Sequence, residues 1–144
     1  MADIKHSIVI DSSPERIYPL VASGSGFSRW WAADVTELES GGIAELGFFN
    51  RATIYRLKLT RATASVETEW LCQTGGEWRD TQLLFRLQPS DRRTVLRFSH
   101  AEWLHDTDYF VSCNTTWGEL MFRLKAAAEG KSPRPLFSMT GLDD

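Results

Sequence analysis

The densest group of side chains able to do chemistry lies where the last predicted strand gives way to the last predicted helix. It consists of His100, Glu102, His105, Asp106 and Asp108. A zinc site or an acid–base pair needs two or three such groups to converge on one point. Their spacing matches no standard metal-binding pattern, and a strand end is expected between the two histidines. We therefore expect a polar connecting loop, with no metal site, no cofactor and no catalytic residue.

A glycine-containing segment, Gly24-Ser25-Gly26, superficially resembles a phosphate-binding loop. Such a loop follows a strand, opens a helix and carries a third glycine at a fixed spacing. This segment instead follows a predicted helix and lacks the third glycine, so we expect a turn. The sequence also contains no nucleophile elbow, P-loop or paired-cysteine metal motif, so none of these motifs indicates an enzyme.

Large aromatic side chains are the second feature with functional meaning, because the chain has six Trp and eight Phe among 144 residues. Aromatic rings bury well and often line ligand pockets, although ordinary core packing is the alternative for each of them. Periodicity places Trp70 and Trp117 inside the protein. Trp78 and Trp103 lie near expected loops, where an indole is harder to bury, so they are candidates for a cavity mouth or a partner surface.

Four polar residues fall on positions expected to face the interior, namely Tyr55, Thr68, His100 and Asn114. A polar group in an apolar cavity must be satisfied by a partner or must orient a ligand. Both roles stay open for these residues. His100 is the one whose ordinary pKa lies close to neutral pH.

The elements that position these residues begin with a strand, since apolar and polar residues alternate over residues 4–10. Residues 12–15 (Ser-Ser-Pro-Glu) then form a helix-start signal, and a second short helix or turn is expected over residues 27–31. From residue 35 to about residue 101 the alternation predicts a continuous run of about six strands.

The pattern then changes to the period of a helix that Asp106 or Thr107 can cap. Gly130 is expected to end this helix, so that about 22 residues span roughly 33 Å. Residues 131–144 are expected to form an irregular tail. The apolar positions recur at spacings of three and four residues: Cys113, Trp117, Leu120, Met121, Leu124 and Ala128.

Composition restricts the class of partner. The formal net charge is −3 and the basic residues are scattered, which argues against nucleic-acid binding because phosphate contacts need clustered Lys and Arg. No apolar run approaches the length of a membrane span, so we expect no membrane insertion. The N-terminus lacks the apolar core of a signal peptide, and the two cysteines look like buried thiols. We expect a cytoplasmic protein with a single domain over residues 1–144.

Several segments resemble, in order, one known superfamily. Residues 8–18 carry its opening strand, small residue, Pro-Glu pair and apolar helix start, and residues 27–31 (Phe-Ser-Arg-Trp-Trp) its paired-tryptophan segment. Residues 94–100 resemble its last strand, and residues 117–125 and 129–131 its final helix and glycine exit. The chain thus resembles START-like, polyketide cyclase-like (SRPBCC) proteins of the AHSA type, named for activators of a heat-shock chaperone's ATPase.

This resemblance implies an α+β, helix-grip fold. A curved antiparallel sheet of about six to seven strands wraps a long C-terminal helix, and two short helices follow the first strand. The family includes lipid carriers, cyclases, stress-related domains and chaperone regulators, so the fold does not name the activity.

Element order and resemblance together predict a cavity between the sheet and the last helix. We expect it to bind an apolar or aromatic small molecule. One alternative is a co-chaperone-like regulator or interaction module, with a homodimer or a chaperone as partner. Another is a cyclase- or hydrolase-type enzyme using His100 with Glu102 or Asp106. The partner surface is assigned to Trp78. The side chains expected to line the cavity are Trp30, Phe48, Tyr55, Leu57, Trp70, Phe85, Phe98, His100, Trp103, Tyr109, Cys113, Asn114, Trp117 and Met121.

Overall fold

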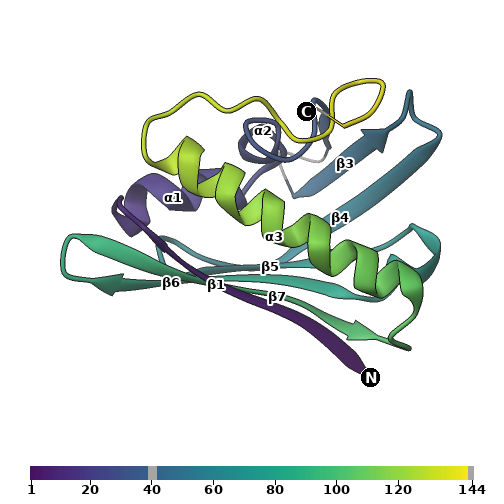
Figure 1. Ribbon diagram of the computed structural model, residues 1–144, viewed down its shortest axis with the longest axis horizontal. Helices are drawn as coiled ribbons and strands as arrows, with labels where there is room; N and C mark the ends of the chain where they lie inside the picture. Colours follow the sequence, from purple (N-terminus) through teal and green to yellow (C-terminus); the bar gives the residue numbers. More distant parts are fainter. Residues whose placement is uncertain (39–41, 143–144) are drawn as a thin grey trace.

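The computed structural model describes residues 1–38 and 42–142, in which seven strands form one antiparallel sheet. The strand order across the sheet is β1-β7-β6-β5-β4-β3-β2 (Figure 1), so the first strand pairs with the last and the others follow as a meander. In chain order the elements are β1 (Ala2–Ile10), α1 (Pro14–Val21), α2 (Gly24–Phe27), β2 (Asp34–Leu38), β3 (Ile43–Phe48), β4 (Thr53–Thr63), β5 (Glu67–Cys72), the 3-10 helix η1 (Gly76–Trp78), β6 (Gln82–Ser90), β7 (Arg93–Trp103) and α3 (Asp108–Ala128).

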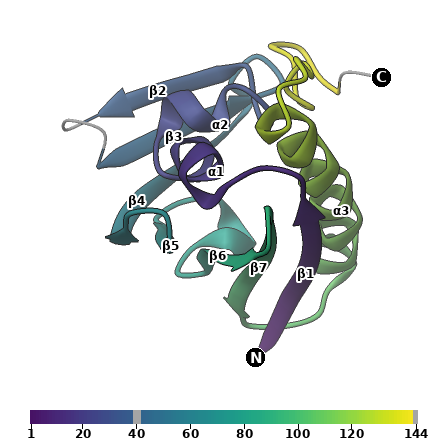
Figure 2. The same ribbon diagram turned by 90° about the vertical axis from the view of Figure 1, so that its left-hand side faces the viewer.

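The sheet is strongly curved, and α3 packs across the open side of the curve (Figure 2). Helices α1 and α2 lie on the same concave side of the sheet. An antiparallel sheet that buries one face against a helix needs this curvature to enclose a core. The predicted helix-grip fold is confirmed in its strand number, its long last helix and its two short helices after β1. None of the described helices combines the length and the apolar character that crossing a bilayer requires.

Helix α3 begins and ends where the sequence indicates. Thr107 is the N-cap, and its Oγ1 accepts a hydrogen bond from the Phe110 N–H at 3.2 Å. Gly130 follows the last turn with φ +84°, a backbone angle that favours glycine. Side chains three and four residues apart share one face of a helix, and that face of α3 packs into the core. All six predicted apolar positions are buried: Cys113, Trp117, Leu120, Met121, Leu124 and Ala128.

The two short helices differ from the prediction in their boundaries. The segment Gly24-Ser25-Gly26, for which the sequence predicts a turn after a helix, instead begins α2. The hydroxyl of Ser23 accepts a hydrogen bond from the Gly26 N–H at 3.1 Å, so Ser23 acts as an N-cap. A side chain on residue 26 would overlap the carbonyl oxygen of Pro19, so glycine lets α2 pack closely on α1.

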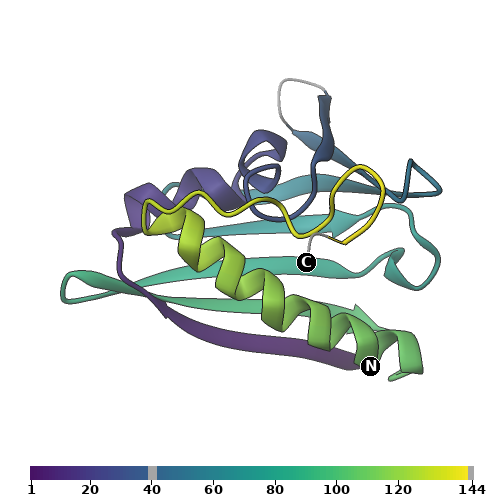
Figure 3. The same cartoon turned by 45° about the horizontal axis from the view of Figure 1, so that its top comes forward.

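Residues 131–142 form no helix or strand, yet backbone hydrogen bonds hold this tail in place. It returns past α3 toward the β3–β4 side of the sheet (Figure 3). Phe137 N–H donates to the Trp31 carbonyl at 3.0 Å, and Ala33 N–H donates to the Phe137 carbonyl at 2.9 Å. The last two residues of the predicted irregular tail, 143 and 144, lie outside the described residues.

Candidate functional site

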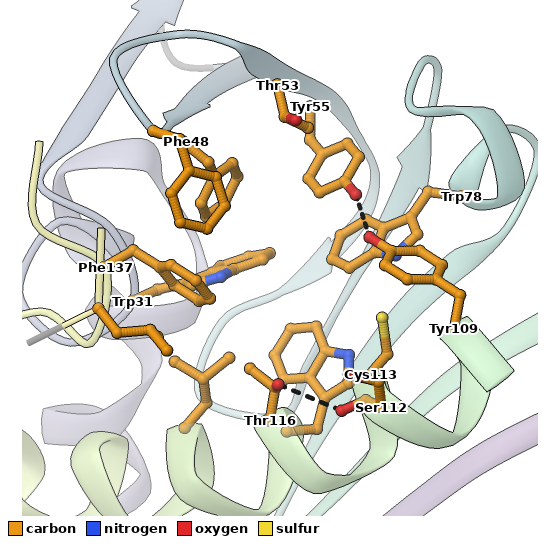
Figure 4. A pocket seen from close by; sticks show the side chains of 14 residues that line it. Trp31, Phe48, Thr53, Tyr55, Trp78, Tyr109, Ser112, Cys113, Thr116 and Phe137 are labelled. Atoms are coloured by element: carbon orange, nitrogen blue, oxygen red, sulfur yellow. Dashed lines mark hydrogen bonds between the residues drawn. The ribbon is translucent and has the colours of Figure 1, made fainter. Parts of the chain in front are cut away.

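A cavity of about 310 Å³ lies between β3, β4, α3 and the C-terminal tail (Figure 4). Most of its wall is aromatic, and none of the described residues that line it carries a formal charge. Its size falls at the lower end of the range for small-molecule sites, about 300–1,000 Å³. The lining residues are Trp31, Phe48, Phe49, Thr53, Tyr55, Trp78, Tyr109, Ser112, Cys113, Thr116, Trp117, Leu120, Phe137 and Leu142.

The rings of this wall pack against one another and form flat surfaces. The Tyr55 ring stacks on Trp78 with a centroid distance of 4.1 Å and an interplanar angle of 3°. Trp117 contacts Trp31 at 5.0 Å between ring centroids. Phe137 of the tail meets Phe48 edge-on, at 4.9 Å and 88° (Figure 4). Stacked and edge-on pairs at these distances are favourable, so each ring holds its neighbour in place.

Helix η1 and the turn before it place Trp78 in the wall. The Thr107 hydroxyl donates to a Glu77 carboxylate oxygen at 2.5 Å, which ties η1 to the start of α3. Gly75 has φ +102°, and a side chain there would overlap the Tyr55 ring, so the turn needs glycine. Trp78 is only 5% exposed, and its expected place on a partner surface is therefore wrong. The sequence locates this indole in a loop, but the loop folds back over the cavity.

His100 lies behind the wall and connects two of its tryptophans. The Trp117 indole N–H donates to His100 Nδ1 at 3.1 Å, so a neutral ring carries its hydrogen on Nε2. Nε2 then donates to the Thr81 hydroxyl at 2.8 Å, and that hydroxyl donates to the Trp78 carbonyl at 2.5 Å. Burial lowers the pKa of His100 from its ordinary value near neutral pH to about 3, so the ring stays neutral at physiological pH. His100 is a positioning residue.

The polar groups of the cavity gather where β4 faces the first turns of α3. The hydroxyls of Tyr55 and Tyr109 share a hydrogen bond (Figure 4). Burial raises the pKa of both phenols, and for Tyr109 the bond to Tyr55 raises it further. Burial also raises the pKa of the Cys113 thiol. All three groups are therefore neutral at physiological pH, and Cys113 lacks the thiolate that a nucleophile needs.

Comparisons with known proteins agree with this architecture. No family model and no curated protein matches the chain. The solution structure of the Aha1 dimer from Colwellia psychrerythraea superposes with a TM-score of 0.78 and 28% sequence identity, covering 90% of this chain and 97% of that chain. The protein has the AHSA/SRPBCC-type fold.

Two further structures share the AHSA/SRPBCC-type fold at lower identity. SSP2350 from Staphylococcus saprophyticus has a TM-score of 0.72 and 16% identity, covering 96% of this chain and 99% of that chain. DynU16, a protein in the dynemicin biosynthetic locus, has a TM-score of 0.72 and 12% identity, covering 92% of this chain but 49% of its own. At such identities these two structures show the fold alone.

Within the AHSA/SRPBCC-type fold, the structure brings some of the predicted residues to the cavity wall: Phe48, Tyr55, Tyr109, Cys113 and Trp117. Another group is buried in the core outside this wall: Trp30, Leu57, Trp70, Phe85, Phe98, His100, Trp103 and Met121. Trp30 and Trp70 have structural tasks, because their indole N–H groups donate to the carbonyls of Leu20 and Val21 at the end of α1, each at 2.9 Å. Thr68 donates to the same Val21 carbonyl at 3.0 Å.

The predicted inward position of Asn114 is wrong, because its side chain is exposed. The cavity lies on the side of α3 that carries Tyr109, Ser112 and Thr116, and Asn114 lies about 100° around the helix from Cys113, away from that side.

The polar residues of the loop after β7 do not converge with His100. Glu102, His105 and Asp106 are exposed, whereas His100 is buried on the opposite side of the strand end. The pair that an acid–base enzyme would need is therefore not brought together. Within the described residues, no group of three His, Cys, Asp or Glu side chains is arranged to hold a metal ion.

Part of the cavity wall is not predicted from the sequence. On α3, Ser112, Thr116 and Leu120 continue the line begun by Tyr109, at spacings of three and four residues. This line borders the core stripe and shares Leu120 with it. Its helical spacing is visible in the sequence and could have predicted these wall residues. The other missed residues are Trp31, Phe49, Thr53, Phe137 and Leu142, which long-range packing brings to the wall without a local pattern.

Proposed function

We propose that the protein binds a neutral, flat, aromatic small molecule in the cavity between the sheet, α3 and the tail. The observation that carries this proposal is a cavity of about 310 Å³ with a mostly aromatic wall and no formal charge. A charged ligand would lose its hydration there without a counter-charge. Because a cavity of about 150 Å³ holds benzene, this one suits a molecule of roughly two rings.

The fold supports the same proposal, since START/SRPBCC-like folds commonly hold hydrophobic ligands. Here the tail contributes to the wall through Phe137, whose ring contacts Phe48 and Phe49. The tail is fixed to Trp31 and Ala33 by backbone hydrogen bonds. The binding site therefore depends on a segment that follows the last helix, as well as on the sheet and α3.

Filling the cavity tests this function. Thr116 lines the cavity, and Thr115 is its exposed neighbour; their hydroxyls make equivalent bonds to the carbonyls of Ser112 and Val111. Thr116→Phe should weaken binding of the two-ring hydrocarbon tetralin at least about tenfold, because the new ring occupies its space. Thr115→Phe should change the affinity less than about twofold, because Thr115 does not line the cavity. Fluorescence titration measures both, and equal affinities would contradict the site.

A second candidate function is self-association through the outer face of α3, which we propose as a contact between two copies. Val111 and Phe122 are 57% and 64% exposed. With Thr115 and Gly118 they form one stripe at spacings of four, three and four residues, and this stripe carries no charge. The similar structure from Colwellia psychrerythraea is that of an Aha1 dimer.

Substitution of a residue in this stripe tests whether the protein forms a dimer through it. Phe122→Glu should shift the protein from dimer to monomer, because it places a charge in the apolar contact. Val66→Glu is the matched control, since Val66 is also exposed, at 49%, but lies between β4 and β5. Sedimentation velocity measures the populations. A monomeric wild type, or equal effects of both substitutions, would rule out this face.

A further inference from the structure

The polar end of the cavity carries side chains that can form hydrogen bonds with a ligand. Tyr55 comes from β4, and Tyr109 and Cys113 come from α3, so the group bridges the two sides of the cavity (Figure 4). Tyr55 is 7% exposed and its ring is fixed against Trp78. The other hydroxyls of the wall are less suited to a ligand. The Thr116 hydroxyl already donates to the Ser112 carbonyl at 3.2 Å, whereas the hydroxyl of Tyr109, although this residue is 38% exposed, is fixed by its bond to Tyr55.

The two phenols have one hydrogen-bond donor more than the protein has strong acceptors for them. Each phenol carries one hydrogen, and the bond between Tyr55 and Tyr109 uses one of the two. The Cys113 thiol adjoins Tyr109, but sulfur is a weak hydrogen-bond acceptor. One phenolic hydrogen is therefore left without a strong acceptor at the wall of an apolar cavity. Tyr55 is buried whereas Tyr109 is 38% exposed, so a ligand oxygen would replace water as the acceptor of this hydrogen.

The protonation state keeps this donor available. Burial raises the pKa of both phenols, so neither loses its hydrogen in the physiological range. The thiol is also neutral, since burial raises its pKa. The group therefore presents a hydrogen-bond donor without a charge. Such a donor favours a neutral acceptor oxygen over a carboxylate, because a carboxylate would lose its hydration without a counter-charge.

We propose that the cavity selects an aromatic ligand carrying a carbonyl-type acceptor oxygen, which accepts a hydrogen bond from the phenol pair of Tyr55 and Tyr109. This inference rests on the proposed function and names the ligand class of the same site. The ring system packs on the flat wall that includes Trp78, and the oxygen points to the phenol pair. The pair thus sets specificity, while the aromatic wall supplies most of the affinity.

A matched pair of probes tests the proposal. 1-Tetralone and tetralin share one ring framework and differ by a carbonyl in place of a methylene group. The wild type should bind 1-tetralone about fivefold more tightly, as expected for one neutral hydrogen bond. The double variant Tyr55→Phe/Tyr109→Phe should bind the two probes with equal affinity, because it keeps both rings and lacks both hydroxyls. These replacements remove both hydroxyls and leave no partner unpaired, and circular dichroism checks the fold.

Two single variants test which group donates the hydrogen bond to the ligand. Tyr109→Phe should keep the preference for 1-tetralone, because Tyr55 then has its own hydrogen to donate. Cys113→Ala should keep it as well, since the thiol is not the donor. Equal binding of both probes by the wild type, or a preference that survives the double variant, would overturn the inference and leave the proposed function intact. Binding of neither probe would overturn both.

Discussion

Lowering the pH from 7 to 5 is expected to reduce the free energy of unfolding by about 2 kcal/mol through His100 alone. The folded protein keeps this ring neutral, because burial lowers its pKa to about 3. The unfolded chain binds a proton below its ordinary pKa of about 6.5. Stability from this group is therefore complete above that pH and is lost progressively as the pH falls toward 3.

The control for this prediction is His100→Gln, which keeps one donor and one acceptor near Trp117 and Thr81 but cannot titrate. Urea unfolding of both proteins at pH 7 and pH 5 measures the difference. Carboxylates such as Glu129, whose pKa is lowered by its bond to Lys125, contribute equally to both proteins. If the variant lost as much stability as the wild type over this range, the buried neutral histidine would be refuted.

Alanine at Gly75 is expected to destabilise the protein by about 3 kcal/mol, and alanine at Gly76 by about 1 kcal/mol. Both residues have positive φ, +102° and +58°, so each substitution strains the backbone. A side chain at residue 75 would also overlap the Tyr55 ring, whereas one at residue 76 meets no atom within 4 Å. Gly75→Ala must therefore move Tyr55 away from its stacked position on Trp78.

The same two variants test whether the turn at Gly75 affects ligand binding through Tyr55. Gly75→Ala should weaken the binding of tetralin, because Tyr55 forms part of the wall, whereas Gly76→Ala should leave it close to the wild-type value. Thermal unfolding followed by fluorescence titration gives both quantities on the same samples. Equal losses of stability and affinity in the two variants would mean that Tyr55 is not held by this turn.

The parts of the fold that follow from the sequence are those with a local period. The core stripe of α3 could be predicted because residues such as Cys113 and Trp117 repeat at helical spacing and need only one apolar partner surface. The helix start at Thr107 has a local cause as well, since its hydroxyl caps the first turn. The alternation of residues 4–10 likewise identifies β1 without knowledge of its neighbour.

The cavity itself depends on contacts between distant segments. Trp30 and Trp31 are adjacent, yet Trp30 is tied to α1 while Trp31 faces the cavity, and no local pattern separates them. Phe137 reaches the wall because the tail pairs with the backbone of residues 31–33. Trp78 is buried because the loop of residues 73–81 returns over β4, and the turn residues alone do not determine this path.

The most direct test of the central claim uses the six tryptophans as internal reporters. Tetralin is titrated into ¹⁵N-labelled protein, and the indole N–H signals are followed by NMR. We expect large, saturable shifts for Trp31, Trp78 and Trp117, which line the cavity. The shifts of Trp30 and Trp70 should be much smaller, because their N–H groups are bound to carbonyls of α1. Uniform shifts, or no shifts up to the solubility limit, would contradict an aromatic ligand site in this cavity.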